Sequence, residues 1–194
     1  MRLSVITALA PLLATALFAA SSAGGADSSS NASSSNLAPS FRFPSVESQD
    51  LDKRLVKLPK DFAGERNLVV IAFQRQQQKD VDTWLDVKKR FETIDPALRY
   101  YELPTLARLN PLARWFIDNG MRGGIPSHEQ RARTITLYLD KEPFRAALGL
   151  GDESSIYVLL LDREGNILWR SQGNFDESKG QSLEQTLERL IHAH

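Results

Sequence analysis

Residues 156–170 read IYVLLLDREGNILWR, and this stretch decides the fold. Its first six residues, from Ile156 to Leu161, are all apolar, as in a strand that is covered on both faces at the centre of a sheet. Residues 162–165 (DREG) end in glycine and predict a turn, after which residues 166–170 return as a second strand. The stretch therefore predicts a β-hairpin whose first strand lies inside the sheet.

The chain before this hairpin alternates between strand and helix patterns. Residues 67–73 (NLVVIAF) form a second continuous apolar run, residues 98–103 predict another strand, and residues 134–139 alternate with period two, as a half-exposed strand does. Helical patterns separate these strands. Their apolar sides are formed by Val81, Trp84, Leu85, Phe91 and Ile94, then by Leu112, Trp115 and Phe116, and then by Phe144 and Leu148.

Start and stop signals bound these helices. Asp95-Pro96 ends the first, Asn110-Pro111 begins the second with Gly120 as its expected end, and the third runs from Asp140 to Gly149. Residues 182–185 (SLEQ) form a capping box that predicts a final helix. The order β-α-β-α-β-α-β-β-α calls for a mixed sheet with helices on both sides. The final helix would turn Leu183, Leu187, Leu190 and Ile191 inward.

The composition excludes several classes of function. None of the 194 residues is cysteine, which rules out disulfides, iron–sulfur clusters, thiolate zinc sites and thiol–disulfide chemistry. The 24 basic side chains balance 24 acidic ones, whereas a dedicated nucleic-acid binder carries a basic excess. The length suits one domain of ordinary size.

The N-terminus predicts export. Between Arg2 and Asp27 there is no charged side chain, and residues 3–20 are mostly Leu, Ala, Val, Ile and Phe. Residues 1–23 are expected to be a cleaved signal peptide, with a retained membrane anchor as the alternative. Residues 24–50 are then a Ser-rich disordered linker and residues 51–194 the folded domain. The protein is expected in the periplasm or secreted, or, if the segment is an organelle presequence, at the mitochondrial inner membrane.

The order of elements, its closing β-β-α and residues 160–167 (LLDREGNI) resemble the redoxin branch of the thioredoxin-like fold. The resemblance implies a three-layer α/β/α sandwich with a mixed central sheet. In that fold the redox cysteines follow the first long strand, a place that Gln74 to Gln78 occupy here. The proline expected before the central strand is also missing near Ser155-Ile156.

A second, narrower resemblance covers residues 110–190. The segments WF (115–116), MRGGIP (121–126), ALG (147–149), YVLLLD (157–162) and ILWRSQG (167–173) are similar to the second half of the mitochondrial ATP synthase assembly factors of the ATP-ten family. That family consists of chaperones associated with the inner membrane, which are not known as enzymes. The resemblance implies an assembly role, although the N-terminus here reads as an export signal.

Two loops carry the candidate binding residues. Gln74, Arg75 and Gln76 form either a polar ligand-contact loop or simply a solvated helix start. Arg122, Arg131 and Arg133, around a loop that ends at Pro126, could clamp a carboxylate, a phosphate or a lipid headgroup. Alternatively, these arginines form salt bridges on the surface. Glu102, Glu129 and Asp140 are then the available partners.

The three tryptophans receive different predictions. Trp84 and Trp115 occupy core positions of their helices and are expected to be packing residues. Trp169 shares a strand face with Ile167 while Leu168 takes the other face, so both faces carry large apolar groups. A partner or the N-terminal arm is expected to cover one of them, which makes Trp169 a candidate binding residue.

Metal and nucleophile chemistry have little support. His128, His192 and His194 are the only histidines, and the last two lie where the chain end frays. The sequence has no Gly-x-Ser-x-Gly elbow and no phosphate-binding loop between a strand and a helix. We therefore expect no metal, no cofactor and no catalytic residue.

The sequence thus predicts an exported thioredoxin-like protein that is not an enzyme and acts as a binding factor of chaperone or assembly type. Its partner is expected to be a protein, which would be associated with a membrane if the role is in assembly. The expected contact surface consists of residues 74–78, residues 122–126 and the Trp169 strand. The alternatives are a module that binds an anion or small molecule, including an enzyme with a non-thiol mechanism, and a redox-dead redoxin homologue that competes for the partners of active ones.

Overall fold

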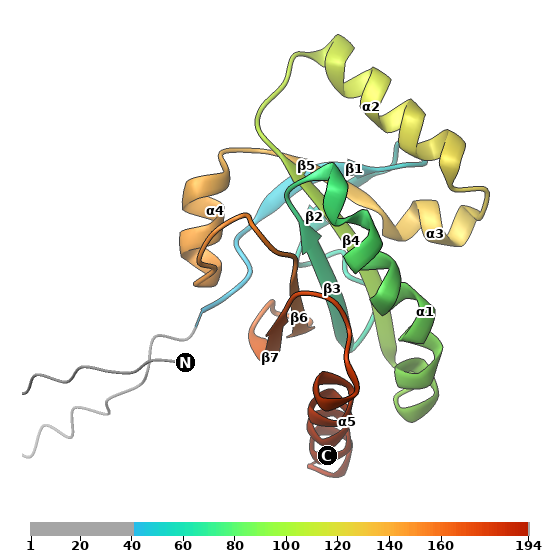
Figure 1. Ribbon diagram of the computed structural model, residues 1–194, viewed down its shortest axis with the longest axis vertical. Coiled ribbons are helices and arrows are strands. Elements are labelled where there is room, and N and C mark those ends of the chain that lie inside the picture. Colours follow the sequence, from blue (N-terminus) through green and yellow to red (C-terminus); the bar gives the residue numbers. More distant parts are fainter. Residues whose placement is uncertain (1–40, 194) are drawn as a thin grey trace, which may run out of the picture. The chain divides into compact units, whose positions relative to one another are not determined.

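The structure is a computed structural model that describes residues 41–193, which form a mixed sheet in the strand order β2-β1-β5-β4-β3-β6-β7 flanked by helices (Figure 1). This is the predicted thioredoxin-like α/β fold. The strands are β1 (Val46–Asp50), β2 (Leu55–Leu58), β3 (Arg66–Ala72), β4 (Leu98–Leu106), β5 (Ile135–Tyr138), β6 (Tyr157–Asp162) and β7 (Ile167–Gln172). The helices are η1 (Arg75–Gln77), α1 (Gln78–Ile94), α2 (Pro111–Gly124), α3 (His128–Arg133), α4 (Lys141–Leu148) and α5 (Glu177–His192).

The two continuous apolar runs form the centre of the sheet. Strand β3 pairs in parallel with β4 and antiparallel with β6, with Val69 opposite Leu159. Strand β7 returns antiparallel to β6, as the hairpin at residues 156–170 predicts. Residues 157–161 are all buried, because helices cover both faces of these strands.

Each face of the sheet carries its own apolar core. Phe144 and Leu148 of α4 pack on one face together with Phe43. Trp84 of α1 and Leu187 of α5 pack on the other. Figure 1 shows α4 and α1 on opposite sides of the strands. None of the helices between residues 41 and 193 combines the length and the apolar character that crossing a bilayer requires.

The folded part begins earlier than the sequence predicts. The expected linker ran to residue 50, but β1 lies inside it and pairs with both β2 and β5. Phe43 is only 2% exposed and makes edge-to-face contacts with Phe62 and Phe144. The prediction failed because β1 (VESQD) is short and polar, and pairing alone makes it a strand. The predicted signal peptide or anchor and the linker up to residue 40 lie outside the described residues.

Two predicted helix boundaries and one predicted burial pattern are wrong. Helix α2 continues past Gly120 because that glycine keeps a helical backbone, whereas Gly149 takes φ = 62° and ends α4 as predicted. Helix α5 begins before the predicted Ser182, because the Asp176 side chain accepts a hydrogen bond from the Lys179 amide at 2.9 Å. Strand β5 is buried at residues 135–137 and not half-exposed. The short helix α3 was not predicted.

Strand β7 contains a β-bulge, which changes the predicted faces. Leu160 pairs with Trp169 but Leu161 pairs with Ile167, so Leu168 is the extra residue. Ile167 therefore packs with the α4 core, while Leu168 and Trp169 pack with the core under α1 and α5. The prediction that Ile167 and Trp169 share a face is wrong for this reason.

Candidate functional site

The loop after β3 is held by the side chain of Gln77. Redox-active members of the thioredoxin-like fold carry their cysteines at this place. Its Oε1 accepts hydrogen bonds from the backbone amides of Phe73 (2.8 Å) and Gln74 (3.1 Å). Its Nε2 donates to the carbonyl of Glu153 at 2.8 Å, and Gln74 Nε2 donates to the same carbonyl at 2.9 Å. These hydrogen bonds therefore connect the loop to the segment that precedes β6, the strand that pairs with β3.

The three residues of this loop that were predicted to bind a ligand or partner lie at the surface, unlike the buried Gln77. Gln74, Arg75 and Gln76 are exposed, and the Gln74 and Gln76 side chains contact one another. Gln77, which the sequence analysis did not single out, is 3% exposed and supplies the structure of the loop. Of the two alternatives from the sequence, this geometry fits a solvated helix start. Arg75 and Gln76 remain available at the surface.

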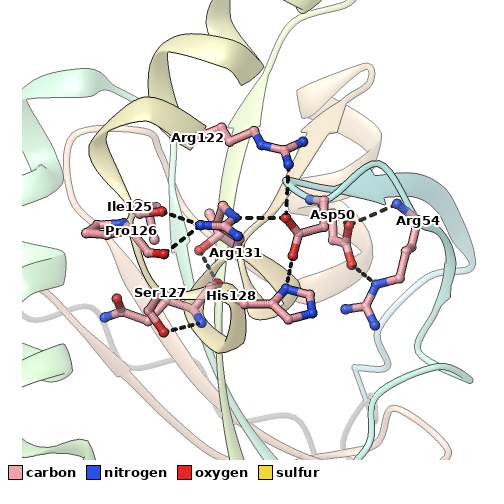
Figure 2. Close-up of polar contacts among 11 residues, drawn as sticks. Asp50, Arg54, Arg122, Ile125, Pro126, Ser127, His128 and Arg131 are labelled. Atoms are coloured by element: carbon pink, nitrogen blue, oxygen red, sulfur yellow. Dashed lines mark hydrogen bonds and ion pairs between the residues drawn. The ribbon is translucent and has the colours of Figure 1, made fainter.

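Two of the three candidate arginines, Arg122 and Arg131 (labelled in Figure 2), meet at Asp52 in the turn between β1 and β2. Arg131 Nε donates to Asp52 Oδ1 at 2.8 Å, and Arg122 Nη2 lies 3.7 Å from the same oxygen. His128 Nδ1 contacts Asp52 Oδ2. The hydrogen bond from Arg131 contributes most to holding the pKa of Asp52 below its usual value. We call these four residues the Asp52 cluster.

The backbone on both sides holds the Asp52 cluster in place. The buried Asp50 carboxylate accepts hydrogen bonds from the amides of Asp52 and Arg54, both at 2.9 Å. On the other side, Arg131 Nη1 donates to the carbonyls of Ile125 (3.0 Å) and Pro126 (2.7 Å). The predicted residue Pro126 therefore takes part through its carbonyl, and the cluster ties the β1–β2 turn to the loop after α2.

Arg133 lies apart from the other two arginines. Its guanidinium group is 2.9 Å from Glu129 and 3.5 Å from Glu92 of α1. Glu129 is one of the partners that the sequence suggested, whereas Asp52 and Glu92 were not identified. Asp52 lies 79 positions from Arg131. The arginines form salt bridges with acidic neighbours and do not converge on a shared anion site.

Glu102 is a partly buried acid under α1 and α3. It lines a cavity of about 10 Å³ together with Tyr100 and Arg133. Burial raises the pKa of Glu102 to about 7, and the nearby Asp82 adds to the increase. The buried Tyr100 hydroxyl has no hydrogen-bond partner within residues 41–193. Glu102 was predicted as a salt-bridge partner of the arginines, but its environment favours the neutral acid.

Trp169 is covered by the protein's own helices. Its Nε1 donates to Ser182 Oγ of α5 at 3.1 Å, and its ring centroid is 6.1 Å from that of Trp84 in α1. A partner is therefore not needed to explain this residue. Trp84 is fully buried, as predicted, and its Nε1 donates to the carbonyl of Gly173 at 3.0 Å.

The large apolar side chains of α2 point outward. Leu112 is 66% exposed, Trp115 52% and Phe116 63%. We call these three residues the α2 face. The prediction that Trp115 packs in the core is wrong, because the helix turns the side that carries Arg114 and Asp118 toward the sheet. There Arg114 lies over the Tyr138 ring at 4.9 Å, and Asp118 accepts a hydrogen bond from the Tyr138 hydroxyl at 2.8 Å.

A groove of about 480 Å³ lies between α2 on one side and β1 and the β1–β2 turn on the other. Trp115 lines it from the helix, and Lys53 and Leu55 line it from the turn and β2. Leu55 is 61% exposed and is the fourth large apolar side chain with high exposure in residues 41–193. The sequence showed an apolar side of this helix, but not the direction in which it points.

The histidines do not share a common centre. His128 contacts Asp52, His192 lies in the last turn of α5, and His194 is outside the described residues. Across residues 41–193 the structure gathers no group of three or more His, Cys, Asp or Glu side chains that could hold a metal ion.

Comparison with known proteins supports the fold. No protein-family model matches the chain, and no curated protein matches its sequence. The structure is similar to the thioredoxin domain of a thiol-disulfide oxidoreductase from Bacteroides vulgatus, with a TM-score of 0.51, 18% identity and coverage of 80% of this chain and 99% of that one. These comparisons lend no support to the ATP-ten resemblance, which remains a prediction from the sequence.

Two further solved structures have the same fold. BsSco, a member of the Sco family of cytochrome c oxidase assembly proteins, has a TM-score of 0.52 with 11% identity, covering 77% of this chain and 95% of that one. The exposed lipoprotein thioredoxin from Streptococcus pneumoniae has a TM-score of 0.50 with 11% identity, covering 75% and 99%. At these identities the similarity concerns the fold alone.

Proposed function

We propose that this protein is a binding factor of the chaperone or assembly type, built on a thioredoxin-like scaffold, that works without catalysis. The observation that carries the proposal is the α2 face. Large apolar side chains on a protein surface are most easily explained by a partner that covers them. Here they are gathered on one helix, beside the exposed Leu55.

The loop after β3 supports the same proposal. The chain has no cysteine, so it lacks the nucleophile of the oxidoreductases whose fold it shares. Gln77 instead accepts hydrogen bonds from the Phe73 and Gln74 amides and donates one to the carbonyl of Glu153. This arrangement keeps the scaffold and replaces the reactive centre by a structural contact.

The assembly type rests on weaker support. The ATP-ten resemblance covers residues 110–190, a range that includes α2 and the loop after it. One protein of the same fold, BsSco, is described as a member of a family of assembly proteins. The fold is thus compatible with this kind of role.

A second candidate is a redox-inert homologue that occupies the partners of active redoxins. Its support is the exposure of Arg75 and Gln76 in the loop where active members of the fold carry their chemistry. On this alternative the partner would contact the loop after β3 and not the α2 face.

Photo-crosslinking separates the two candidates. The full chain would carry benzoylphenylalanine at position 116, 76 or 89 and be irradiated in living cells that produce it. Lys89 is exposed on α1, belongs to neither surface, and serves as the control. We expect adducts, with protein or with phospholipid, from position 116 and none from position 89.

Adducts from position 76 in place of 116 would favour the redox-inert competitor. If position 116 gave no more adduct than position 89, the α2 face would be uncovered in the cell and the proposed function would be wrong.

A further inference from the structure

The α2 face, on which the proposed function rests, also carries chemistry that indicates what covers it. Leu112, Trp115 and Phe116 are spaced i, i+3 and i+4, so they form one stripe along the helix. Trp115 and Phe116 stack edge to face, with ring centroids 5.0 Å apart. Their rings form a single aromatic ridge at the surface.

Arginines lie at both ends of this stripe. Arg122 follows Trp115 by seven residues and so lies two turns further along the same side of α2. Its side chain is 43% exposed, and its closest carboxylate, Asp52, is already bonded to Arg131. Before the helix, Arg108 is exposed and forms no ion pair within residues 41–193.

The charge of this part of the chain differs from that of the whole. Residues 106–133 contain five arginines and two acidic residues, whereas the complete chain has equal numbers of basic and acidic residues. Of those two acids, Asp118 faces Tyr138 and Glu129 faces Arg133. Arg131 and Arg133 are paired with acids as well, so Arg108 and Arg122 supply the basic charge beside the stripe.

The β1–β2 turn extends the same surface. Leu55 and Lys53 line the groove opposite Trp115, and both are exposed. Arg54 is exposed as well, with its Nε paired to the buried Asp50. An apolar centre with a basic rim is thus built from two elements that the Asp52 cluster connects.

The apolar centre is large enough for one binding contact. Four side chains at about 50–65% exposure present roughly 400–500 Å². A stable protein interface buries about 800 Å² on each partner, a little over half of it apolar, so the area alone would also suit a protein. The exposed arginines beside the aromatic ridge favour a bilayer surface, because Trp, Phe and Leu enter the interfacial region while arginines bind anionic headgroups.

The chain outside the structure is compatible with that location. Residues 3–20 are apolar in sequence, and 20 residues separate them from Phe41, where the structure begins. Extended, 20 residues span roughly 65–70 Å. A membrane-inserted N-terminal segment would therefore leave the α2 face within reach of the same bilayer.

We propose that the α2 face, with Leu55 and the arginines at its ends, binds the surface of a bilayer that contains anionic phospholipids. The aromatic ridge lies at the level of the headgroups, and Arg108 and Arg122 contact lipid phosphates. A factor held in this way meets membrane-associated partners at the surface where they are located.

Fluorescence of Trp115 provides a test on the full chain. Trp84 is fully buried and Trp169 packs beneath α5, so a Trp115→Phe variant isolates the signal of Trp115. The chain would be mixed with vesicles of phosphatidylcholine containing about 30% phosphatidylglycerol and a phospholipid with a nitroxide near the headgroup. We expect quenching that the Trp115→Phe variant lacks and that Phe116→Ser greatly weakens.

Charge is tested by matched substitutions. Each basic residue near an anionic membrane contributes about fivefold to binding. Arg108→Gln is therefore expected to shift the lipid concentration of half-maximal quenching about fivefold, and Lys89→Gln on α1 to leave it unchanged. Circular dichroism would verify that each variant is folded.

The outcomes separate this inference from the proposed function. Absence of Trp115 quenching, or equal quenching in vesicles of phosphatidylcholine alone, would overturn the assignment to anionic lipid. If position 116 then crosslinked to a protein in cells, the binding function would stand with a protein as the occupant. If position 116 crosslinked to nothing, both would fall.

Discussion

Gln77 shows at the scale of one residue how the loop after β3 keeps its shape without sulfur. Its amide group accepts from two backbone amides and donates to a carbonyl on the segment that enters β6. The bond from the Phe73 amide is buried and the other two are partly buried, where an unpaired backbone group is costly. The Gln77 side chain thus satisfies backbone groups that a strand or a helix would otherwise pair.

Gln77→Ala is expected to lower the free energy of unfolding by about 2 kcal/mol, because it leaves the buried Phe73 amide and the partly buried Gln74 amide without this acceptor. The neighbouring Gln76 is exposed, so Gln76→Ala is expected to change stability by less than about 0.5 kcal/mol. Urea unfolding followed by circular dichroism measures both. Equal effects of the two substitutions would show that Gln77 does not hold the loop.

Glu102 makes stability depend on pH. Its pKa rises from 4.5 to about 7 on folding, so the folded protein keeps this proton over a range in which the unfolded chain has lost it. The contribution of Glu102 to stability is therefore full below about pH 4.5, falls as the pH rises from about 4.5 to 7, and is level above that. The total loss is up to about 3 kcal/mol.

Glu102→Gln is expected to remove this part of the pH dependence and to make the protein more stable than the wild type at pH 8. Glu188→Gln, at an exposed position of α5, is the control and is expected to follow the wild type. The measurement is urea unfolding between pH 4.5 and 8. If the two variants gave parallel curves, burial of Glu102 would not be the cause.

Helix α2 differs from the other long helices at the scale of the element. Helices α1, α4 and α5 each bury apolar side chains against the sheet, whereas every side chain of α2 is exposed or half-buried. Its inward side is held by polar contacts to Tyr138. The apolar side of α2 therefore contributes little to folding, which leaves it free for binding.

A pair of phenylalanines tests this difference. Phe91 of α1 is fully buried, and Phe91→Ala is expected to lower stability by about 3–5 kcal/mol. Phe116→Ala is expected to change it by less than about 0.5 kcal/mol, because the side chain is already in water. Thermal unfolding compares them. A large loss with Phe116→Ala would mean that α2 packs its apolar side inward.

The whole molecule shows which parts of the fold the sequence predicts. The runs at residues 67–73 and 156–161 can only be buried strands, and β3 and β6 form the centre of the sheet as expected. Strand β1 (VESQD) escaped notice because most of its residues are polar and because its pairing with β5 joins positions far apart. Local patterns cannot report such pairing.

The candidate site was less predictable for the same reason. The sequence identified Arg122, Arg131 and Arg133, but Asp52 meets two of them only through the tertiary fold. The spacing of Leu112, Trp115 and Phe116 predicted one side of a helix. Whether that side points to the core or to solvent depends on what lies beneath α2, which is the groove beside β1 and the Tyr138 side chain that contacts Arg114 and Asp118.

The early start of the domain can be tested by truncation. A chain that begins at Phe41 keeps Phe43 and β1, and is expected to unfold cooperatively at the temperature of the full chain. A chain that begins at Leu51 loses both, exposes the edge of β5, and is expected to lack a cooperative transition. Equal melting temperatures for the two would show that β1 is dispensable.

Crosslinking at position 116, with position 89 as its control, tests the central claim most directly, since it asks whether the outward apolar side of α2 is covered in the cell. The account predicts adducts of protein or phospholipid at 116 and none at 89. Equal yields at the two positions would contradict it.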